Sequence, residues 1–250
     1  RVVSRSIRYA LSLLPLLVAV SAGGCGAAAS RTTPADHAKP PQVDGCVRLG
    51  PRARVLTLHP RGAAALPAVL LGSSTTIFVL SNESDENLCS WLPFAGELMA
   101  HGYAALLYDY RNPTDLPADA HAGAMAALLA GAHRIILMGA SVGARASIEA
   151  AGIDRPQIAA VIALSAERTV RSDPRDLTGP ARDVTSPTLL VAARQDPYVT
   201  GATLPLLRAL AGAEKRALIV PGMDHGTALL TDSNGPRVRS AILSFVASSR

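Results

Sequence analysis

Apolar runs of strand length alternate with stretches of helical pattern over most of the chain, from Cys46 to the C-terminus. The runs, among them TTIFVL and RIILM, are continuously apolar, which is typical of strands buried on both faces of a mostly parallel sheet. We therefore predict an α/β fold with helices on both faces of the sheet. The predicted strands are residues 55–59, 68–71, 75–80, 104–108, 134–138, 158–164, 188–193 and 217–220, and the predicted helices are residues 91–101, 118–130, 141–151, 201–210 and 238–247.

The first 24 residues have the pattern of a secretory signal peptide. Arginines precede an apolar run, residues 9–22, and small residues follow it. The run is too short, and too broken by residues such as Pro15, for a good membrane-spanning helix. We predict a signal peptide over residues 1–24, a flexible, Pro-rich tether over residues 25–45 and one folded domain over residues 46–250.

The segment Ala22-Gly23-Gly24-Cys25 resembles the lipobox of bacterial lipoproteins. In that family the Cys becomes the lipidated first residue of the mature protein. The resemblance therefore implies that Cys25 is lipidated and anchors an extracytoplasmic protein to the cell membrane. The lipobox more often has Leu where this chain has Ala22. The alternative is a plain secretory signal, cleaved near Ala22 or Ala27, and a secreted protein.

The cysteines fit an exported protein. The chain has three of them, and if Cys25 carries lipid, Cys46 and Cys89 remain as a pair. An oxidising compartment favours a disulfide between these two residues. Such a bridge would pin the start of the domain to the segment after the third strand. The alternative is two unpaired, buried thiols.

Composition bounds the class of protein. The chain has 250 residues and is 49% hydrophobic, which is enough for one large core. Aromatic residues make up only 4% and the net charge of +5 is dispersed, so we expect no nucleic-acid partner. No His, Cys and Asp grouping has zinc spacing and no Gly-rich loop has the pattern of a phosphate cradle, so we expect no metal and no cofactor. We expect a monomer.

A Gly-Ala-Ser-Val-Gly turn centred on Ser141 joins a predicted strand to a predicted helix. This strand–turn–helix context is the one that a nucleophile elbow requires. The turn is tight, so Ser141 must take a strained conformation, while Gly139 and Gly143 keep side chains out of the close strand–helix packing. The helix N-terminus favours negative charge developing near the Ser. The turn therefore predicts that Ser141 is a nucleophile.

The partners that a serine nucleophile needs follow downstream in the chain. A Ser hydroxyl needs a base, and the base needs an acid that orients it. Asp196 follows the strand predicted at 188–193, and His225 follows the last predicted strand. Both positions lie at carboxyl ends of strands, and the order Ser, acid, His is the order of the elbow-bearing hydrolases. The other acids considered for this role are Asp224, Asp173, Asp176 and Asp183.

From about residue 55 to the C-terminus, the chain resembles the α/β-hydrolase family, close to its dienelactone-hydrolase-like and small lipase- or esterase-like members. The family's nucleophile, acid and base fall on Ser141, Asp196 and His225. The loop around the acid and the His-Gly pair after the last strand also match the family pattern. Residues 108–111, Tyr-Asp-Tyr-Arg, resemble the family's D-x-R stretch, which we interpret as structural.

The oxyanion hole is where the chain departs from that family. One donor should be the backbone N–H of Val142, and the other should come from the loop after the third strand, residues 81–85. Relatives often carry His-Gly in this loop, and here Asn82 takes the place of the Gly, since Asn tolerates positive φ. The N–H of Glu83 is the best candidate for the second donor, followed by those of Asn82 and Ser84. Acidic side chains here would oppose a nearby anion and favour a cationic or neutral substrate.

Only residues 165–187 lie between the sixth and seventh predicted strands, and this segment is too short to form a large helical cap. We therefore expect an open, shallow site that suits a small ester or an acyl group displayed on a larger envelope molecule. The resemblance implies a carboxylesterase that works through an acyl-enzyme on Ser141, with His225 as the base. The alternatives are a peptidase on the same fold and a non-catalytic envelope lipoprotein that uses the fold as a binding scaffold.

Overall fold

The computed structural model describes residues 45–47, 50–111, 115–153, 156–171 and 173–249. The predicted signal peptide, the lipidation site at Cys25 and the tether up to residue 44 lie outside the described residues.

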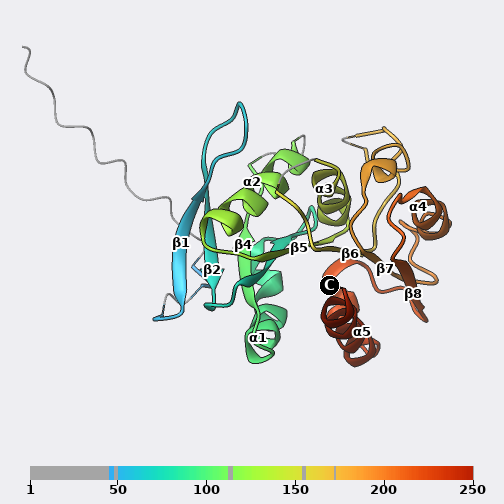
Figure 1. Ribbon diagram of the computed structural model, residues 1–250. Coiled ribbons are helices and arrows are strands. Elements are labelled where there is room, and N and C mark those ends of the chain that lie inside the picture. The colour runs from blue at the N-terminus through green and yellow to red at the C-terminus, as the bar shows by residue number, and fades with distance from the viewer. Residues whose placement is uncertain (1–44, 48–49, 112–114, 154–155, 172, 250) are drawn as a thin grey trace, which may run out of the picture. The chain divides into compact units, whose positions relative to one another are not determined.

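One mostly parallel sheet organises the domain (Figure 1). Its strand order is β1-β2-β4-β3-β5-β6-β7-β8, with β1 and β2 antiparallel to their neighbours and the pairs from β4 to β8 parallel. This order puts β3 and β5 at the middle of the sheet, side by side. The strands are β1 Ala53–Leu58, β2 Leu66–Leu71, β3 Thr76–Ser81, β4 Ala104–Tyr108, β5 Arg134–Ala140, β6 Ala160–Leu164, β7 Thr188–Ala193 and β8 Lys215–Val220.

Helices cover both faces of this sheet. Figure 1 shows α2 and α3 on one face and α1 and α5 on the other. Side chains of α4 belong to the same core cluster as those of α2 and α3. The α-helices are α1 Leu92–Ala100, α2 Leu116–Leu129, α3 Val142–Ala151, α4 Thr203–Ala209 and α5 Gly235–Ser248, and the 3-10 helices are η1 Leu88–Trp91, η2 Pro180–Asp183 and η3 Gly226–Leu230.

The core consists of two layers separated by the sheet. Along β3, Ile77 and Val79 point into the layer under α2 and α3, while Phe78 and Leu80 point into the layer under α1 and α5. These four side chains are all buried, so β3 has no polar face. The apolar runs in the sequence are continuous because helices cover both faces of the sheet. The predicted α/β architecture is confirmed.

The predicted elements are all present, with shifted ends. Helix α2 begins at Leu116 rather than at residue 118, because Pro117 falls in the first turn, where its missing N–H is not needed. Strand β8 begins at Lys215 rather than at residue 217; it is the last strand of the sheet order, where charged side chains can face water. The three short 3-10 helices were not predicted. In the described residues, no helix has both the length and the apolar character needed to cross a bilayer.

The predicted disulfide between Cys46 and Cys89 is present, with 6.1 Å between the two Cα atoms. It joins the segment before β1 to η1, the 3-10 helix that follows the loop after β3. The bridge therefore fastens the start of the domain close to the loop in which the second oxyanion donor is predicted.

Candidate active site

Ser141 lies in the turn between the central strand β5 and α3. Its φ of 53° and ψ of −116° are strained for a residue with a side chain. The backbone N–H of Ser141 donates to the carbonyl of Leu164 at the end of β6, at 2.9 Å, which fixes the turn to the neighbouring strand. The side chain is 4% exposed and stands at the N-terminus of α3. The strain that the sequence predicts for a nucleophile elbow is therefore present at this residue.

The two glycines of the turn are required by close contacts. A Cβ atom on Gly139 would lie 2.1 Å from the carbonyl oxygen of Gly143. A Cβ atom on Gly143 would lie 2.2 Å from the carbonyl oxygen of Ser81 and 2.5 Å from that of Asn82. The first residues of α3 thus pack directly against the end of β3 and the loop that follows it. This contact places the start of α3, whose first residue is Val142, beside that loop.

Asp196 and His225 form a hydrogen-bonded pair. Nδ1 of His225 lies 2.7 Å from Oδ2 of Asp196, whose side chain is completely buried. The other carboxylate oxygen of Asp196 accepts the N–H of Tyr198 at 3.0 Å, so the carboxylate is oriented by its own loop. A charged Asp196 favours the tautomer with the proton on Nδ1, which leaves Nε2 as an acceptor. The Tyr198 ring packs on the imidazole, with 4.8 Å between centroids.

The other acids considered for the role of Asp196 have different partners. Asp224 accepts a hydrogen bond from Asn234. Asp173 and Asp176 pair with arginines, and Asp183 lies on η2. Within the described residues, Asp196 is the carboxylate that contacts His225.

The loop that carries His225 is held by residues from two other strand ends. The N–H of Gly226 donates to Oγ of Ser165, which follows β6 and has a φ of 50°. Oε1 of Glu83, in the loop after β3, accepts the N–H of Thr227 at 3.0 Å and its hydroxyl at 2.5 Å. The carboxyl ends of β3, β6 and β8 therefore converge on this loop, as expected for a reactive edge of a parallel sheet.

Glu167 is a site residue that the sequence analysis did not identify. The hydroxyl of Ser141 donates to its Oε1 at 2.9 Å, and within the described residues this bond, rather than one to His225, is the hydrogen bond of that hydroxyl. Glu167 follows β6, the strand beside β5. The rule that pointed to Asp196 and His225, a polar residue just after a parallel strand, also applies to Glu167 and could have identified it.

The backbone conformation of Asn82, in the loop after β3, differs from the prediction. Asn82 was expected to take the positive φ of the Gly that it replaces, but among the described residues with a side chain only Ser141 and Ser165 have positive φ. Asn82 is instead held by hydrogen bonds: its side-chain amide donates to the carbonyl of Glu86 at 2.7 Å, and its own carbonyl accepts the hydroxyl of Tyr110 at 2.6 Å. This loop needs no left-handed residue, because side-chain contacts fix it.

Residues 108–111 support that loop. The hydroxyl of Tyr108 and Oγ of Ser81 are 2.6 Å apart, and the carboxylate of Asp109 accepts the N–H of Leu88 at 2.6 Å. Burial raises the pKa of Tyr108 and of Tyr110, so both phenols stay protonated and Tyr110 can donate. The structural interpretation of this stretch agrees with these contacts.

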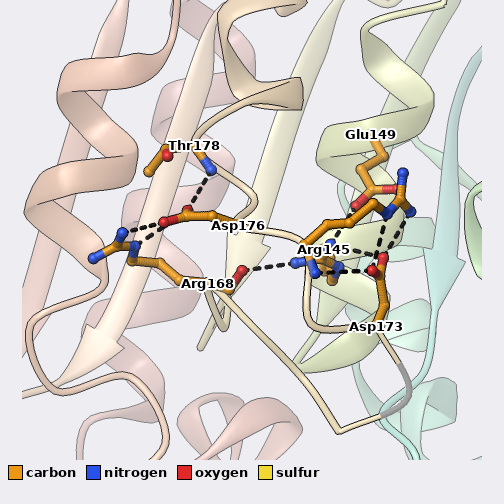
Figure 2. Close-up of polar contacts among 7 residues, drawn as sticks. Arg145, Glu149, Arg168, Asp173, Asp176 and Thr178 are labelled. Carbon is orange, nitrogen blue, oxygen red and sulfur yellow. Dashed lines mark hydrogen bonds and ion pairs between the residues drawn. The ribbon is translucent and has the colours of Figure 1, made fainter.

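A network of charged side chains ties the segment after β6 to α3 (Figure 2). The buried guanidinium of Arg145 donates to the carbonyl of Arg168 and to the carboxylate of Asp173, both at 2.8 Å. It also pairs with Glu149 at 3.0 Å, and Arg168 pairs with Asp176. Since Arg168 follows Glu167, the network fixes the backbone next to the carboxylate that contacts Ser141. In the described part of the chain, no group of three or more His, Cys, Asp or Glu side chains is placed to hold a metal ion.

The architecture is similar to that of solved hydrolase structures. An esterase of Pyrococcus furiosus superposes with a TM-score of 0.69 at 15% identity, over 84% of this chain and 96% of the esterase. A monoacylglycerol lipase of Paleococcus ferrophilus gives 0.64 at 14% identity, over 74% and 99%. A dienelactone hydrolase of Anabaena variabilis gives 0.63 at 19% identity, over 79% and 97%. At these identities the likeness concerns the fold, and it confirms the predicted α/β-hydrolase fold.

No protein-family model and no curated protein sequence matches the chain.

Proposed function

We propose that this protein is an exported serine hydrolase, a carboxylesterase that forms an acyl-enzyme on Ser141. The observation that carries the proposal is the strained Ser141 at the strand–helix turn, at the sheet edge that also bears the hydrogen-bonded pair of the buried Asp196 and the partly exposed His225. A strained residue persists only where its surroundings over-determine it, and such residues concentrate at active sites. The fold shared with an esterase, a monoacylglycerol lipase and a dienelactone hydrolase supports a hydrolase, and export rests on the N-terminal sequence.

In the proposed reaction, Nε2 of His225 takes the proton of Ser141 while Oγ attacks the ester carbonyl. Asp196 keeps the ring in the required tautomer and stabilises the imidazolium that forms. The amide of Val142 donates to the developing oxyanion, because the first amides of a helix have no partner within it. The amide of Glu83 or of Asn82 supplies the second donor. His225 then protonates the leaving alcohol, and a water molecule activated by the same ring releases the acid.

The hydroxyl of Ser141 must turn before this reaction begins. It donates to Glu167 at 2.9 Å in the structure, and attack requires it to donate to His225. Rotation about the Cα–Cβ bond moves the hydroxyl between staggered positions without moving the backbone. Release from Glu167 is therefore the first event of the proposed mechanism.

The substrate that we propose is a small ester, or an acyl group displayed on an envelope molecule, reached by a protein anchored through Cys25. Only a short segment, residues 165–187, stands where a cap would lie, and it is tied down to α3 through Arg145. A short and fixed segment is consistent with an open site. We propose no nucleic-acid partner.

The test is a series of p-nitrophenyl esters of increasing acyl length, with a fluorophosphonate probe in parallel. We expect Ser141→Ala to lower kcat by at least about a thousandfold, because it removes the oxygen that forms the acyl-enzyme. Ser147→Ala is the matched control. It removes a buried hydroxyl from α3, the helix that follows Ser141, and that hydroxyl has no hydrogen-bond partner among the described residues. The control should keep full activity, whereas ester hydrolysis that survives Ser141→Ala would contradict the mechanism.

The second candidate function is a non-catalytic envelope lipoprotein that binds through this fold. It is favoured by the hydrogen bond from Ser141 to Glu167, which among the described residues takes the place of one to His225. In that case the fluorophosphonate would not label Ser141 in well-folded protein. Hydrolysis of peptide amides, but not of short esters, would point instead to a peptidase.

A further inference from the structure

The carboxylate of Glu167 touches the proposed nucleophile, yet it is not part of the Asp196–His225 pair. Its Oε1 accepts the Ser141 hydroxyl at 2.9 Å. A substrate carbonyl that approaches Ser141 must come within a few ångströms of the same carboxylate. The charge of Glu167 is therefore part of the surface that a substrate meets.

This charge is held in place by the protein and is not neutralised by it. Arg145 fixes the carbonyl of Arg168 at 2.8 Å, so the backbone that follows Glu167 is tied to the helix that begins after Ser141 (Figure 2). The two guanidinium groups have other partners: Arg145 pairs with Glu149 and Asp173, and Arg168 pairs with Asp176. Among the described residues, no Arg, Lys or His forms an ion pair with Glu167.

The surroundings of His225 add to the negative character. The carboxylate of Glu83, 7% exposed, accepts hydrogen bonds only from neutral donors of Thr227, so no described cation balances it. The Tyr198 ring, 66% exposed, packs beside His225, whose loop Glu83 holds, and adds an aromatic face to this part of the site. A cation near an aromatic face and a carboxylate is stabilised, while an anion there is repelled.

We propose that Glu167 is the specificity-determining residue of this site, and that it makes the enzyme prefer esters with a positively charged group and reject esters with a negatively charged one. The inference rests on the proposed ester hydrolysis at Ser141. When the Ser141 hydroxyl turns to His225, Glu167 loses its hydrogen-bond donor. An ammonium group of the substrate replaces that donor with an ion pair, a neutral group leaves the carboxylate to water, and an anionic group repels it.

The experiment compares three p-nitrophenyl esters of different charge: those of pentanoic acid, of 4-(trimethylammonio)butanoic acid and of succinic acid as the half-ester. Glu167→Gln is the central variant, because it keeps the shape and an acceptor for Ser141 but removes the charge. Asp183→Asn, an exposed acid of η2 in the same segment, is the matched control for net charge. The quantity measured is the ratio of kcat/KM for the cationic ester to that for the anionic ester.

We expect the wild-type ratio to fall by about tenfold or more in Glu167→Gln and by less than about twofold in Asp183→Asn, since a nearby charge acts strongly and a distant exposed one is screened. The neutral ester should change much less than the ratio does. If the ratio measured for Glu167→Gln stays within twofold of the wild-type ratio, this inference is overturned while the proposed ester hydrolysis stands. Hydrolysis of none of the three esters by the wild type overturns both this inference and the proposed function.

Discussion

The contact between α3 and the loop after β3 can be tested by adding one methyl group, in Gly143→Ala. The new Cβ atom would lie 2.2 Å from the carbonyl oxygen of Ser81, 2.5 Å from that of Asn82 and 2.6 Å from the hydroxyl of Tyr110. Ordinary van der Waals contact of a Cβ atom begins near 3.4 Å. The start of α3 and the segment Ser81–Asn82 must therefore separate by about 1 Å. Ser81 cannot yield, because it belongs to β3 and is paired in register with Gly139 of β5.

The start of α3 or the loop at Asn82 must therefore move. Overpacking of this kind costs about 1–3 kcal/mol, and the hydrogen bond from Tyr110 to Asn82 contributes about another 1 kcal/mol if it breaks. We expect Gly143→Ala to lower the free energy of unfolding by about 2–4 kcal/mol. The movement also separates the two proposed oxyanion donors, which should lower kcat by about 10²- to 10³-fold.

Urea unfolding followed by circular dichroism gives the stability, and hydrolysis of a short p-nitrophenyl ester gives kcat. Gly96→Ala is the matched control, because Gly96 is exposed in α1 and its new Cβ would meet no atom within 4 Å. That variant should keep its activity and gain about 0.5–1 kcal/mol from the better helix propensity of Ala. The close packing of Gly143 is refuted if the free energy of unfolding of Gly143→Ala lies within about 0.5 kcal/mol of the wild-type value, which is roughly the experimental error, and its kcat is unchanged.

Three further outcomes follow from the charge network and the disulfide. Arg145→Met should destabilise the fold by about 3 kcal/mol in urea unfolding, because it removes the buried cation of Glu149 and Asp173 and leaves these carboxylates only the exposed Arg175; a loss below about 1 kcal/mol would contradict the role assigned to the network. Hydrogen bonds from Arg175, and then from Arg145, hold the pKa of Asp173 below its usual range, so the fold gains stability from this group above the ordinary carboxyl pKa of about 4 and loses it as the pH falls further. The difference in unfolding free energy between wild type and Asp173→Asn should therefore be present at neutral pH and shrink on acidification, and a difference that grows would refute this sign. Removing the disulfide with Cys46→Ser and Cys89→Ser should cost about 2–4 kcal/mol for a separation of 43 residues, and a reductant should lower the stability of the wild type but not that of the double variant.

The architecture could be predicted from the sequence because its signals are local. Each buried strand is an unbroken apolar run, and Ser141, Asp196 and His225 each follow such a run in the expected order. The carboxyl ends of parallel strands lie at the same edge of the sheet. The strand prediction alone therefore indicated at which edge these three side chains would meet.

The remaining features depend on contacts between distant segments. The bond from Ser141 to Glu167 arises because β6 lies beside β5, and a single carboxylate in a polar segment gives no periodic signal. Asn82 was assigned a positive φ by analogy with the Gly of relatives, whereas the hydroxyl of Tyr110, 28 residues away, holds its carbonyl in another conformation. Tertiary contacts of this kind override local preference and cannot be read from spacing.

The disulfide also decides how the domain bears a mechanical load. Strand β1 pairs antiparallel with β2 and stands first in the sheet order, so tension on the chain upstream would peel it away one hydrogen-bonded pair at a time. Cys46 precedes β1, and its covalent link passes to Cys89 in η1, next to the interior strands β3 and β4. Tension applied upstream of Cys46 therefore bypasses the weak outer hairpin and enters the sheet near its middle, where several strands must shear together before any one yields.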